Sequence, residues 1–466
     1  YGGSDSATAN LHVTGDINSV NQGVYAESRG YQDSRTSVTV GGNVVSENDT
    51  AVYVNAETGK TDVTVGGNAE GIDYGLDVWT SGNGKANVDV KGFVTGQEEG
   101  IDVWSKDKSE INVSVGKDVN SDENNAINIY AQNNSTVNAE IKGNVTSNEE
   151  YGASLYGSVN SDSEKNTITL SVDGDLRGEL AGLLIFPENS KIDVLVTGTI
   201  YAGEEGAIVA SDLTDTDVVG TKTAVNITVY KVEAGENGVV GYEAELLSEN
   251  ALLSENNASE SDSQVKLANT ASLNQNASIE NSINYIIKLE QPKAGGALSA
   301  LKADGTAVDK SFGYDVAKAN QRVLLKVNLE DGYAVKGAYN GEGTKVALLK
   351  DSDGNYYVDV PKTGGVYLSV ELEKTVTTDT TTTTNTDTTT TPTVTVTPVT
   401  TDTPTTTTVV TTDSPSTSTT VTTTTTTNSS SPKTGDSTNL MLVFGIMAMS
   451  VMGMVVISIK RRKDEE

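Results

Sequence analysis

Three apolar motifs recur in the same order, about every 25 residues, through the first half of the chain. The first motif follows a turn and supplies one apolar residue per repeat: Ile17, Val44, Ala69, Val94, Val119, Val145, Leu176 and Ile200. The second motif supplies alternating pairs: Val24/Ala26, Val52/Val54, Leu76/Val78, Ile101/Val103, Ile127/Ile129, Ala153/Leu155, Leu183/Ile185 and Ala207/Val209. The third motif supplies further pairs: Val38/Val40, Val63/Val65, Val88/Val90, Val113/Val115, Ala139/Ile141, Leu170/Val172, Val194/Val196 and Ile227/Val229.

Alternation at every second residue is typical of a strand with one buried face. Three such strands per repeat predict an all-β chain whose residues 1–245 form a parallel β-helix, with coils stacked at about 4.8 Å. A leucine-rich repeat has a similar period, but its Leu/Asn signature is missing. A left-handed helix of hexapeptides would need a six-residue period within each coil, and the chain shows none.

Polar inserts separate the second and third motifs in two repeats, at residues 156–165 and 211–223. We expect them to form corner loops that leave the stack undisturbed. This part of the chain resembles the β-helical passenger and adhesin regions of bacterial surface proteins.

One outward position, directly after the second motif, is occupied by Glu27, Asn55, Trp79, Trp104, Tyr130, Tyr156, Phe186 and Ala210. The aromatic members, Trp79, Trp104, Tyr130, Tyr156 and Phe186, are candidate ligand-binding residues, because sugars stack on flat rings. The alternative is a ladder of rings that stabilises a solvent face. Asp77 and Asp102 precede the tryptophans by two residues, as hydrogen-bonding partners or as solvated charges.

Enzymes also use this fold, but the sequence predicts no catalytic residue. A lyase needs a strong base beside carboxylates, whereas Arg29, Arg35 and Arg177 lie far apart in the repeat. A hydrolase needs paired carboxylates, which Asp77 and Asp102 on adjacent coils could supply. Stacked acids are common on an acidic solenoid, so we expect a protein that is not an enzyme. The single histidine, His12, is expected to be a surface residue.

Composition narrows the choice of partners and cofactors. The net charge of −32 argues against binding to nucleic acid, which requires a surface rich in lysine and arginine. The chain has no cysteine, which excludes disulfides, catalytic thiols and zinc–thiolate sites. The sequence predicts neither a metal site nor a cofactor.

The repeat dissolves after residue 245, and we expect a cap or linker at 246–281. Strand patterns return at 285–289, 323–329, 333–335, 345–349, 356–360 and 366–372, which predicts a small β-sandwich-like module at 282–374. Asp331-Gly332 and Asp353-Gly354-Asn355 are expected to be hairpin turns, the second in preference to a calcium loop. With Gly332–Gly337 and Tyr356–Pro361, the module resembles small β modules repeated in Gram-positive surface proteins.

Residues 375–430 are almost wholly threonine with proline, valine, aspartate and serine. Such a segment has no apolar face to bury, so we expect a disordered stalk of up to ~170 Å that spans a cell wall. Its hydroxyls are possible sites of O-glycosylation.

The end of the chain combines Ser431-Pro432-Lys433-Thr434-Gly435, an apolar run from Leu440 to Ile459, and a basic cluster at 460–463. The apolar run is long enough for a transmembrane helix. Basic residues stay on the cytoplasmic side of a membrane, so the cluster predicts that the bulk of the chain lies on the outer side. This order of parts resembles the cell-wall sorting signal of Gram-positive bacteria, with Ser431 where leucine is commonest. The resemblance implies that a sortase cleaves after Thr434 and joins it to peptidoglycan. An uncleaved single-pass anchor is the alternative.

The resemblance implies a protein on the extracellular face of the cell wall, with sortase and peptidoglycan as partners. We expect an adhesin that binds glycans or host surface molecules; an enzyme on carbohydrates and a structural spacer are the alternatives. Export requires a signal peptide, and none is visible near Tyr1, so we expect a trimmed or incomplete N-terminus. The internal Pro361-Lys362-Thr363-Gly364 repeats the sorting tetrapeptide between strands and is expected to be a turn.

Overall fold

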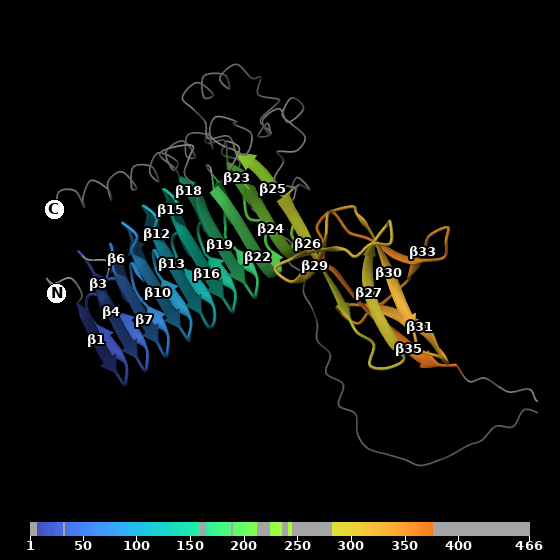
Figure 1. Cartoon of the computed structure of the whole chain (residues 1–466), viewed down its shortest axis with the longest axis horizontal. Helices are drawn as coiled ribbons and strands as arrows, with labels where there is room; N and C mark the ends of the chain where they lie inside the picture. Colours follow the sequence, from blue (N-terminus) through green and yellow to red (C-terminus); the bar gives the residue numbers. More distant parts are fainter. Residues whose placement is uncertain are drawn as a thin grey trace, which may run out of the picture. The chain divides into compact units, whose positions relative to one another are not determined.

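The computed structural model describes residues 7–30, 33–158, 165–187, 190–211, 224–234, 241–244 and 282–375. The regular elements in these ranges are strands, and those up to residue 244 form a parallel β-solenoid (Figure 1). Seven coils contain three separate strands each, as the repeated motifs predict. The all-β, β-helical fold class is therefore confirmed.

The strands form three stacks, numbered here after the three sequence motifs. Stack 1 contains β2 (Ile17–Ser19), β5 (Val44–Ser46), β8 (Ala69–Glu70), β11 (Val94–Gly96), β14 (Val119–Ser121), β17 (Val145–Ser147) and β20 (Leu176–Arg177). Stack 2 contains β3 (Val24–Ser28), β6 (Val52–Ala56), β9 (Tyr74–Thr80), β12 (Glu99–Lys106), β15 (Ile127–Gln132), β18 (Tyr151–Ser158), β21 (Ala181–Pro187), β23 (Gly206–Ser211) and β25 (Gly241–Ala244). Stack 3 contains β1 (Thr8–Val13), β4 (Arg35–Val40), β7 (Lys60–Val65), β10 (Lys85–Val90), β13 (Glu110–Val115), β16 (Thr136–Ile141), β19 (Asn166–Val172), β22 (Ser190–Ile200) and β24 (Ala224–Val232).

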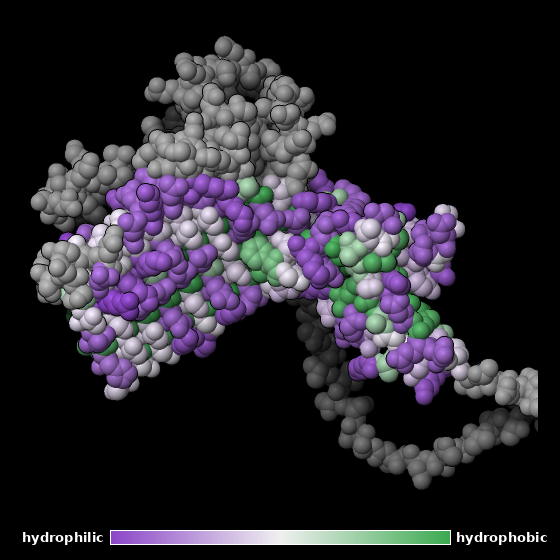
Figure 2. Space-filling view, viewed as in Figure 1, coloured by the Kyte–Doolittle hydropathy of each residue, from purple (hydrophilic) through white to green (hydrophobic). Residues whose placement is uncertain are grey.

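The interior of the solenoid is built from the alternating β-branched residues. In stack 3, for example, Val65 pairs in register with Val90, which pairs with Val115, and all three are fully buried. Identical positions thus lie above one another and bury a continuous apolar column. The polar residues between them point outward, and Figure 2 shows a largely hydrophilic surface on the visible solenoid face.

Side-chain oxygens tie the turns between stacks 3 and 1 together. The backbone amide of Asn43 donates to Asp16 Oδ1 at 2.7 Å, and the backbone amide of Asn68 donates to Asn43 Oδ1 at 2.8 Å. A Cβ at Gly67 would lie 2.2 Å from Asn43 Oδ1, so this turn requires glycine. The backbone donors of the corners are therefore satisfied by the coil before them.

The predicted phase of one strand is wrong. The structure pairs Leu183 with Ile208 and Ile185 with Ala210, so the inward pair is Ile208/Ala210 and not Ala207/Val209. Residues 207–210 are all apolar, and such a run carries no alternation from which a face could be assigned. A shift of one residue exchanges the two faces of a strand.

A second module follows the solenoid. Its strands are β26 (Ile283–Glu290), β27 (Gly296–Lys302), β28 (Asp309–Ser311), β29 (Tyr314–Ala317), β30 (Arg322–Leu329), β31 (Tyr333–Asn340), β32 (Lys345–Val346), β33 (Leu349–Lys350), β34 (Tyr356–Asp359) and β35 (Val366–Lys374). One four-stranded sheet has the order β27-β30-β34-β33. Strand β26 pairs in parallel with both β24 and β35, so it continues stack 3 beyond the last coil. Ile283 and Tyr285 of β26 belong to the same hydrophobic cluster as the solenoid interior.

Sequence patterns missed β27, β28 and β29, and the strand predicted at 345–349 is divided between β32 and β33. Asp353-Gly354-Asn355 forms the predicted hairpin turn between β33 and β34, where the Gly354 amide donates to Asp351 O at 3.1 Å. Asp331-Gly332 is a turn but not a hairpin, since β30 and β31 before and after it pair with different neighbours. A turn signal identifies a chain reversal and not the pairing of its arms.

Several predictions lie outside the described residues: the cap or linker at 246–281, the stalk beyond Thr375, the sorting signal at 431–466 with its apolar run, and most of the two inserts.

Candidate functional site

The register of stack 2 brings the predicted aromatic residues into one column. Backbone pairing places Trp79 beside Trp104, Trp104 beside Tyr130, Tyr130 beside Tyr156, and Tyr156 beside Phe186. All five side chains are half-buried on the outer face of the sheet. We call these residues the aromatic column.

The rings of the aromatic column stack on one another. Trp79 and Trp104 have centroids 5.1 Å apart and planes inclined by 6°, and Tyr156 and Phe186 lie 4.6 Å apart at 9°. Tyr130 lies 4.4 Å from Trp104 and 6.5 Å from Tyr156, with tilted planes. The coil spacing of about 4.8 Å lies within the range of centroid separations between stacked rings. The ring faces therefore cover each other, and the ring edges point outward. The rings therefore form a ladder, and their faces are not free for sugars to stack on.

A second column of side chains runs beside the rings, two residues earlier on each strand. Asp77, Asp102, Asn128 and Ser154 are paired in register on successive coils. We call these four residues the polar column. Reasoning from the sequence found the two aspartates but missed Asn128 and Ser154, although their spacing from each aromatic residue is the same.

The aspartates of the polar column are buried, so their interpretation as solvated charges is wrong. Asp77 exposes only 2% of its surface to solvent, and Asp102 only 7%. Trp104 Nε1 donates to Asp102 Oδ2 at 3.1 Å, and Asn128 Nδ2 donates to Asp102 Oδ1 at 3.1 Å. Asp102 thus links the two columns, which is the hydrogen-bonding role that the sequence left open. The burial arises where neighbouring coils stack, and this cannot be seen in a single repeat.

Further acidic and phenolic groups adjoin the columns. Burial raises the pKa of the Glu99 carboxyl well above its ordinary value, and the nearby charge of Asp102 raises it further. Burial also raises the pKa of Tyr74, with the charges of Asp102 and Glu99 as the next causes. Tyr151 donates from its hydroxyl to Glu205 Oε2 at 2.8 Å. These groups start their strands or lie in the corner before stack 2, where the sequence offers no periodic signal.

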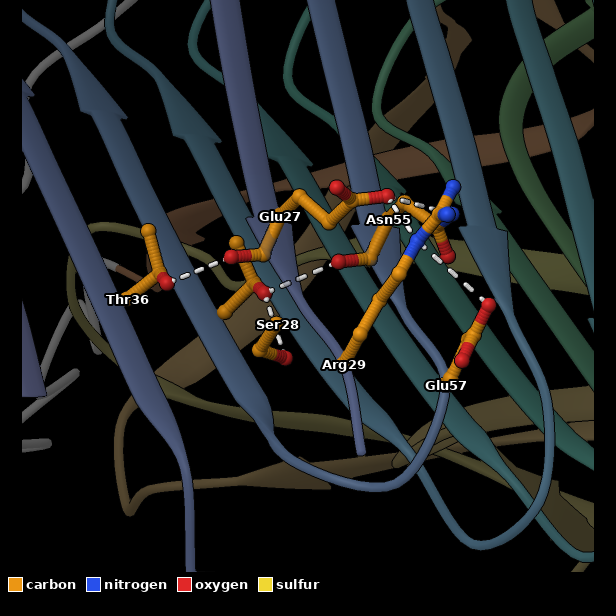
Figure 3. Close-up of polar contacts among 7 residues, drawn as sticks. Glu27, Ser28, Arg29, Thr36, Asn55 and Glu57 are labelled. Carbon is orange, nitrogen blue, oxygen red and sulfur yellow. Dashed lines mark hydrogen bonds and ion pairs between the residues drawn. The ribbon is translucent and has the colours of Figure 1, made fainter. Parts of the chain in front are cut away.

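The aromatic column ends at the third coil. The positions that align with Trp79 in the first two coils are Glu27 and Asn55, and Asn55 Nδ2 donates to Glu27 Oε1 at 3.2 Å. Arg29 forms ion pairs with Glu27 and, at 3.4 Å, with Glu57 (Figure 3). A cluster of charged and polar groups, of which Arg29 is exposed and Glu27 half-buried, therefore replaces the rings at this end of the face.

In these two coils, tyrosines occupy the positions that align with the polar column. Tyr25 and Tyr53 align with Asp77 of the polar column and stack with centroids 5.0 Å apart. At the other end, the prediction that Ala210 occupies the same outward position is wrong, because Ala210 pairs with Ile185 and faces the core. His12 is exposed in β1, as predicted.

The acidic groups near the columns predict a dependence of stability on pH. Burial is the first cause that raises the pKa of Glu99, Glu98, Glu150 and Asp73. A carboxyl whose pKa is higher in the folded state stabilises the fold when protonated, and this contribution is lost as the pH rises through that pKa. We therefore expect a higher Tm near pH ~5.5 than near pH ~7.5, measured by circular dichroism.

Glu99→Gln is the control for this effect, because it removes the carboxyl whose pKa burial raises well above its ordinary value while preserving the shape of the side chain. The variant should show a smaller rise in Tm on acidification. A wild-type Tm that falls over the same interval would contradict the assignment.

The described residues were searched for two other kinds of site. Within those ranges no cluster of three or more histidine, cysteine, aspartate or glutamate side chains is arranged to hold a metal ion. The same part of the chain has no helix with the length and apolar character needed to cross a membrane.

Comparison with known proteins identifies the end of the chain. Residues 432–466 match the family model of the LPXTG cell wall anchor motif. Neither the curated proteins nor the solved structures contain a significant match. The anchor match agrees with the tetrapeptide, apolar run and basic cluster of the sequence, and it implies processing by sortase and covalent attachment to peptidoglycan. The chain is therefore a sortase-anchored surface protein of the Gram-positive type, exposed on the cell wall with a β-solenoid as its head.

Proposed function

We propose that this protein is an adhesin that binds a glycan along the outer face of stack 2. The observation that carries the proposal is the parallel run of the aromatic and polar columns over the same coils. Glycans present hydroxyls and apolar C–H patches in alternation. Ring edges would contact the C–H patches, while Asn128, the half-buried member of the polar column, would bind the hydroxyls.

Repetition suits an extended ligand better than a small molecule. The five coils from β9 to β21 each offer a ring at a spacing of about 4.8 Å, and several weak contacts made together raise the overall affinity. The backbone of the face is held in parallel pairing on both sides, from β6 to β21. A preorganised surface loses little conformational entropy on binding.

The proposed role is binding and not catalysis. The two columns contain no lysine, arginine or histidine that could act as the base of a lyase. The carboxylate of Asp102 accepts hydrogen bonds from both Trp104 and Asn128. These contacts hold the carboxylate in place.

A glycan array, probed with the protein released from the wall, is the first experiment. For a glycan that binds, Asn128→Ala should weaken the affinity by about tenfold or more, because it removes a hydrogen-bonding group from the polar column. Asn138→Ala is the matched control: the residue is also half-buried and outward-facing, but lies on stack 3 in β16. It should leave binding unchanged.

Two outcomes would overturn the proposal. Equal affinities of the Asn128 and Asn138 variants would place the ligand on another face. Shortening of the bound glycan, detected as new reducing ends, would instead indicate an enzyme. Removing Trp79 and Trp104 together is a weaker test, because their stacking also stabilises the fold by about 0.5–1.5 kcal/mol.

A further inference from the structure

The tetrapeptide of the sorting signal occurs twice in the chain. Pro432-Lys433-Thr434-Gly435 lies in the matched anchor region, and Pro361-Lys362-Thr363-Gly364 lies in the second module. Both copies precede the apolar run Leu440 to Ile459, so the run does not separate them. The internal copy is described by the structure, and the anchor copy is not.

The internal copy forms a closed turn, as the sequence predicted. The amide of Gly364 donates to Pro361 O at 3.0 Å, and the carbonyl of Thr363 accepts from the Val232 amide at 2.9 Å. The peptide bond between Thr363 and Gly364 is thus hydrogen-bonded on both sides. Gly364 has a φ of +73°, which an extended substrate segment does not adopt.

The partners that close the turn come from both parts of the structure. From the last described coil, β24 supplies Val232, and its Lys231 forms an antiparallel bridge with Gly364. From the module, the hydroxyl of Tyr285 donates to Lys362 O at 2.9 Å. The ring of Tyr285 packs so closely that a Cβ at Gly364 would lie 2.1 Å from it.

We propose that the Thr363–Gly364 bond is a second, latent sorting site, which packing of its turn against β24 and Tyr285 keeps closed. In the reaction, the nucleophile of sortase attacks the carbonyl carbon of Thr363, and the bond to Gly364 nitrogen breaks. That nitrogen leaves as an amine with the proton it gains. An amino group of peptidoglycan then displaces the enzyme from the Thr363 acyl group.

Closure follows from the hydrogen bonds. The oxygen of an attacked carbonyl must receive hydrogen bonds from the enzyme as negative charge develops on it, whereas Thr363 O is held by Val232. The turn must also open into an extended segment. A chain in which the turn is not packed against β24 would be joined to the wall at Thr363, without the threonine-rich segment 375–430. Folding before sorting would thus decide which threonine is used.

Synthetic peptides test whether the internal tetrapeptide is a substrate. Residues 357–367 and 428–438 would each be incubated with the sortase that cleaves after Thr434 and with an amine acceptor. We expect both peptides to be cleaved, and the folded full chain to be cleaved only after Thr434, as mass spectrometry would show. An intact 357–367 peptide would overturn the proposal, and so would cleavage of the folded chain after Thr363.

In cells, a gain of wall attachment tests whether packing against β24 and Tyr285 keeps the Thr363–Gly364 turn closed. Thr434→Ala alone should leave the protein out of the wall. Adding Tyr285→Ala, or Val232→Pro to delete the donor itself, should restore attachment through Thr363 by about tenfold or more above that background. Tyr339→Ala, a tyrosine change in β31, is the matched control and should restore nothing.

The product identifies the site that was used. Wall fragments from the opened variants should end at Thr363, and a further Thr363→Ala change should abolish them. If both opened variants remain out of the wall, the tetrapeptide is not a latent site and the proposal falls. This result would not affect the adhesin proposal, which concerns stack 2.

Discussion

Val103→Asp should lower the free energy of unfolding by more than about 3 kcal/mol, because it places an unpaired charge in the apolar interior. Val103 is fully buried in β12, where it pairs in register with Val78 and Ile129. A carboxylate at this position has apolar residues above and below it. The measurement is a melting curve followed by circular dichroism or by a denaturant titration.

Thr39→Asp is the control for this change. It introduces the same carboxylate in β4, at a half-buried outward position that pairs with His12 and Thr64. Its effect should remain within about 1 kcal/mol, as is usual for surface substitutions. A Val103→Asp variant that melts like the wild type would contradict the solenoid, which places that side chain in its interior.

The fold was predictable because each repeat states the same rule. Alternation of Val and Ile with polar residues assigns a face to each strand, and repetition at a constant period places each face over the next. The prediction failed where the sequence shows no alternation. Residues 207–210 are uniformly apolar, so only pairing with β21 decides that Ile208 and Ala210 face inward.

The candidate site was predictable in position but not in geometry. Counting residues after the second motif located all five rings of the aromatic column. The orientation of the rings depends on contacts between coils. Trp79 and Trp104 stack because neighbouring parallel strands, and hence neighbouring coils, lie about 4.8 Å apart. The burial of Asp102 depends likewise on Trp104 and Asn128, which the fold brings together.

The junction between the solenoid and the module could not be predicted from local patterns. Ile227 of β24 pairs with Ile283 of β26, and Thr228 donates from its hydroxyl to Ser311 Oγ at 2.6 Å. Both contacts join segments far apart in sequence. Turn and strand signals act over a few residues, so they carry no information about such pairing. The module thus covers the last strand of stack 3.

Thr434→Ala should remove the protein from the wall and leave it in the membrane fraction. The anchor match covers Thr434 together with the apolar run and the basic cluster behind it. In the implied reaction the Thr434 carbonyl becomes the acyl group that joins peptidoglycan. An enzyme site built to recognise a hydroxyl discriminates strongly against its absence, so the wall-bound fraction should fall by about tenfold or more. The amount released from purified walls by muramidase is the measurement.

Thr363→Ala is the matched control, because it makes the same change in the second copy of the tetrapeptide. In the folded chain the carbonyl of Thr363 accepts from Val232, and the neighbouring Gly364 is buried. This variant should therefore be anchored like the wild type. Recovery of the Thr434→Ala protein from muramidase-digested walls at the wild-type level, in fragments that do not end at Thr363, would rule out Thr434 as the point of attachment. If the recovered fragments instead ended at Thr363, the internal turn would be open in the cell.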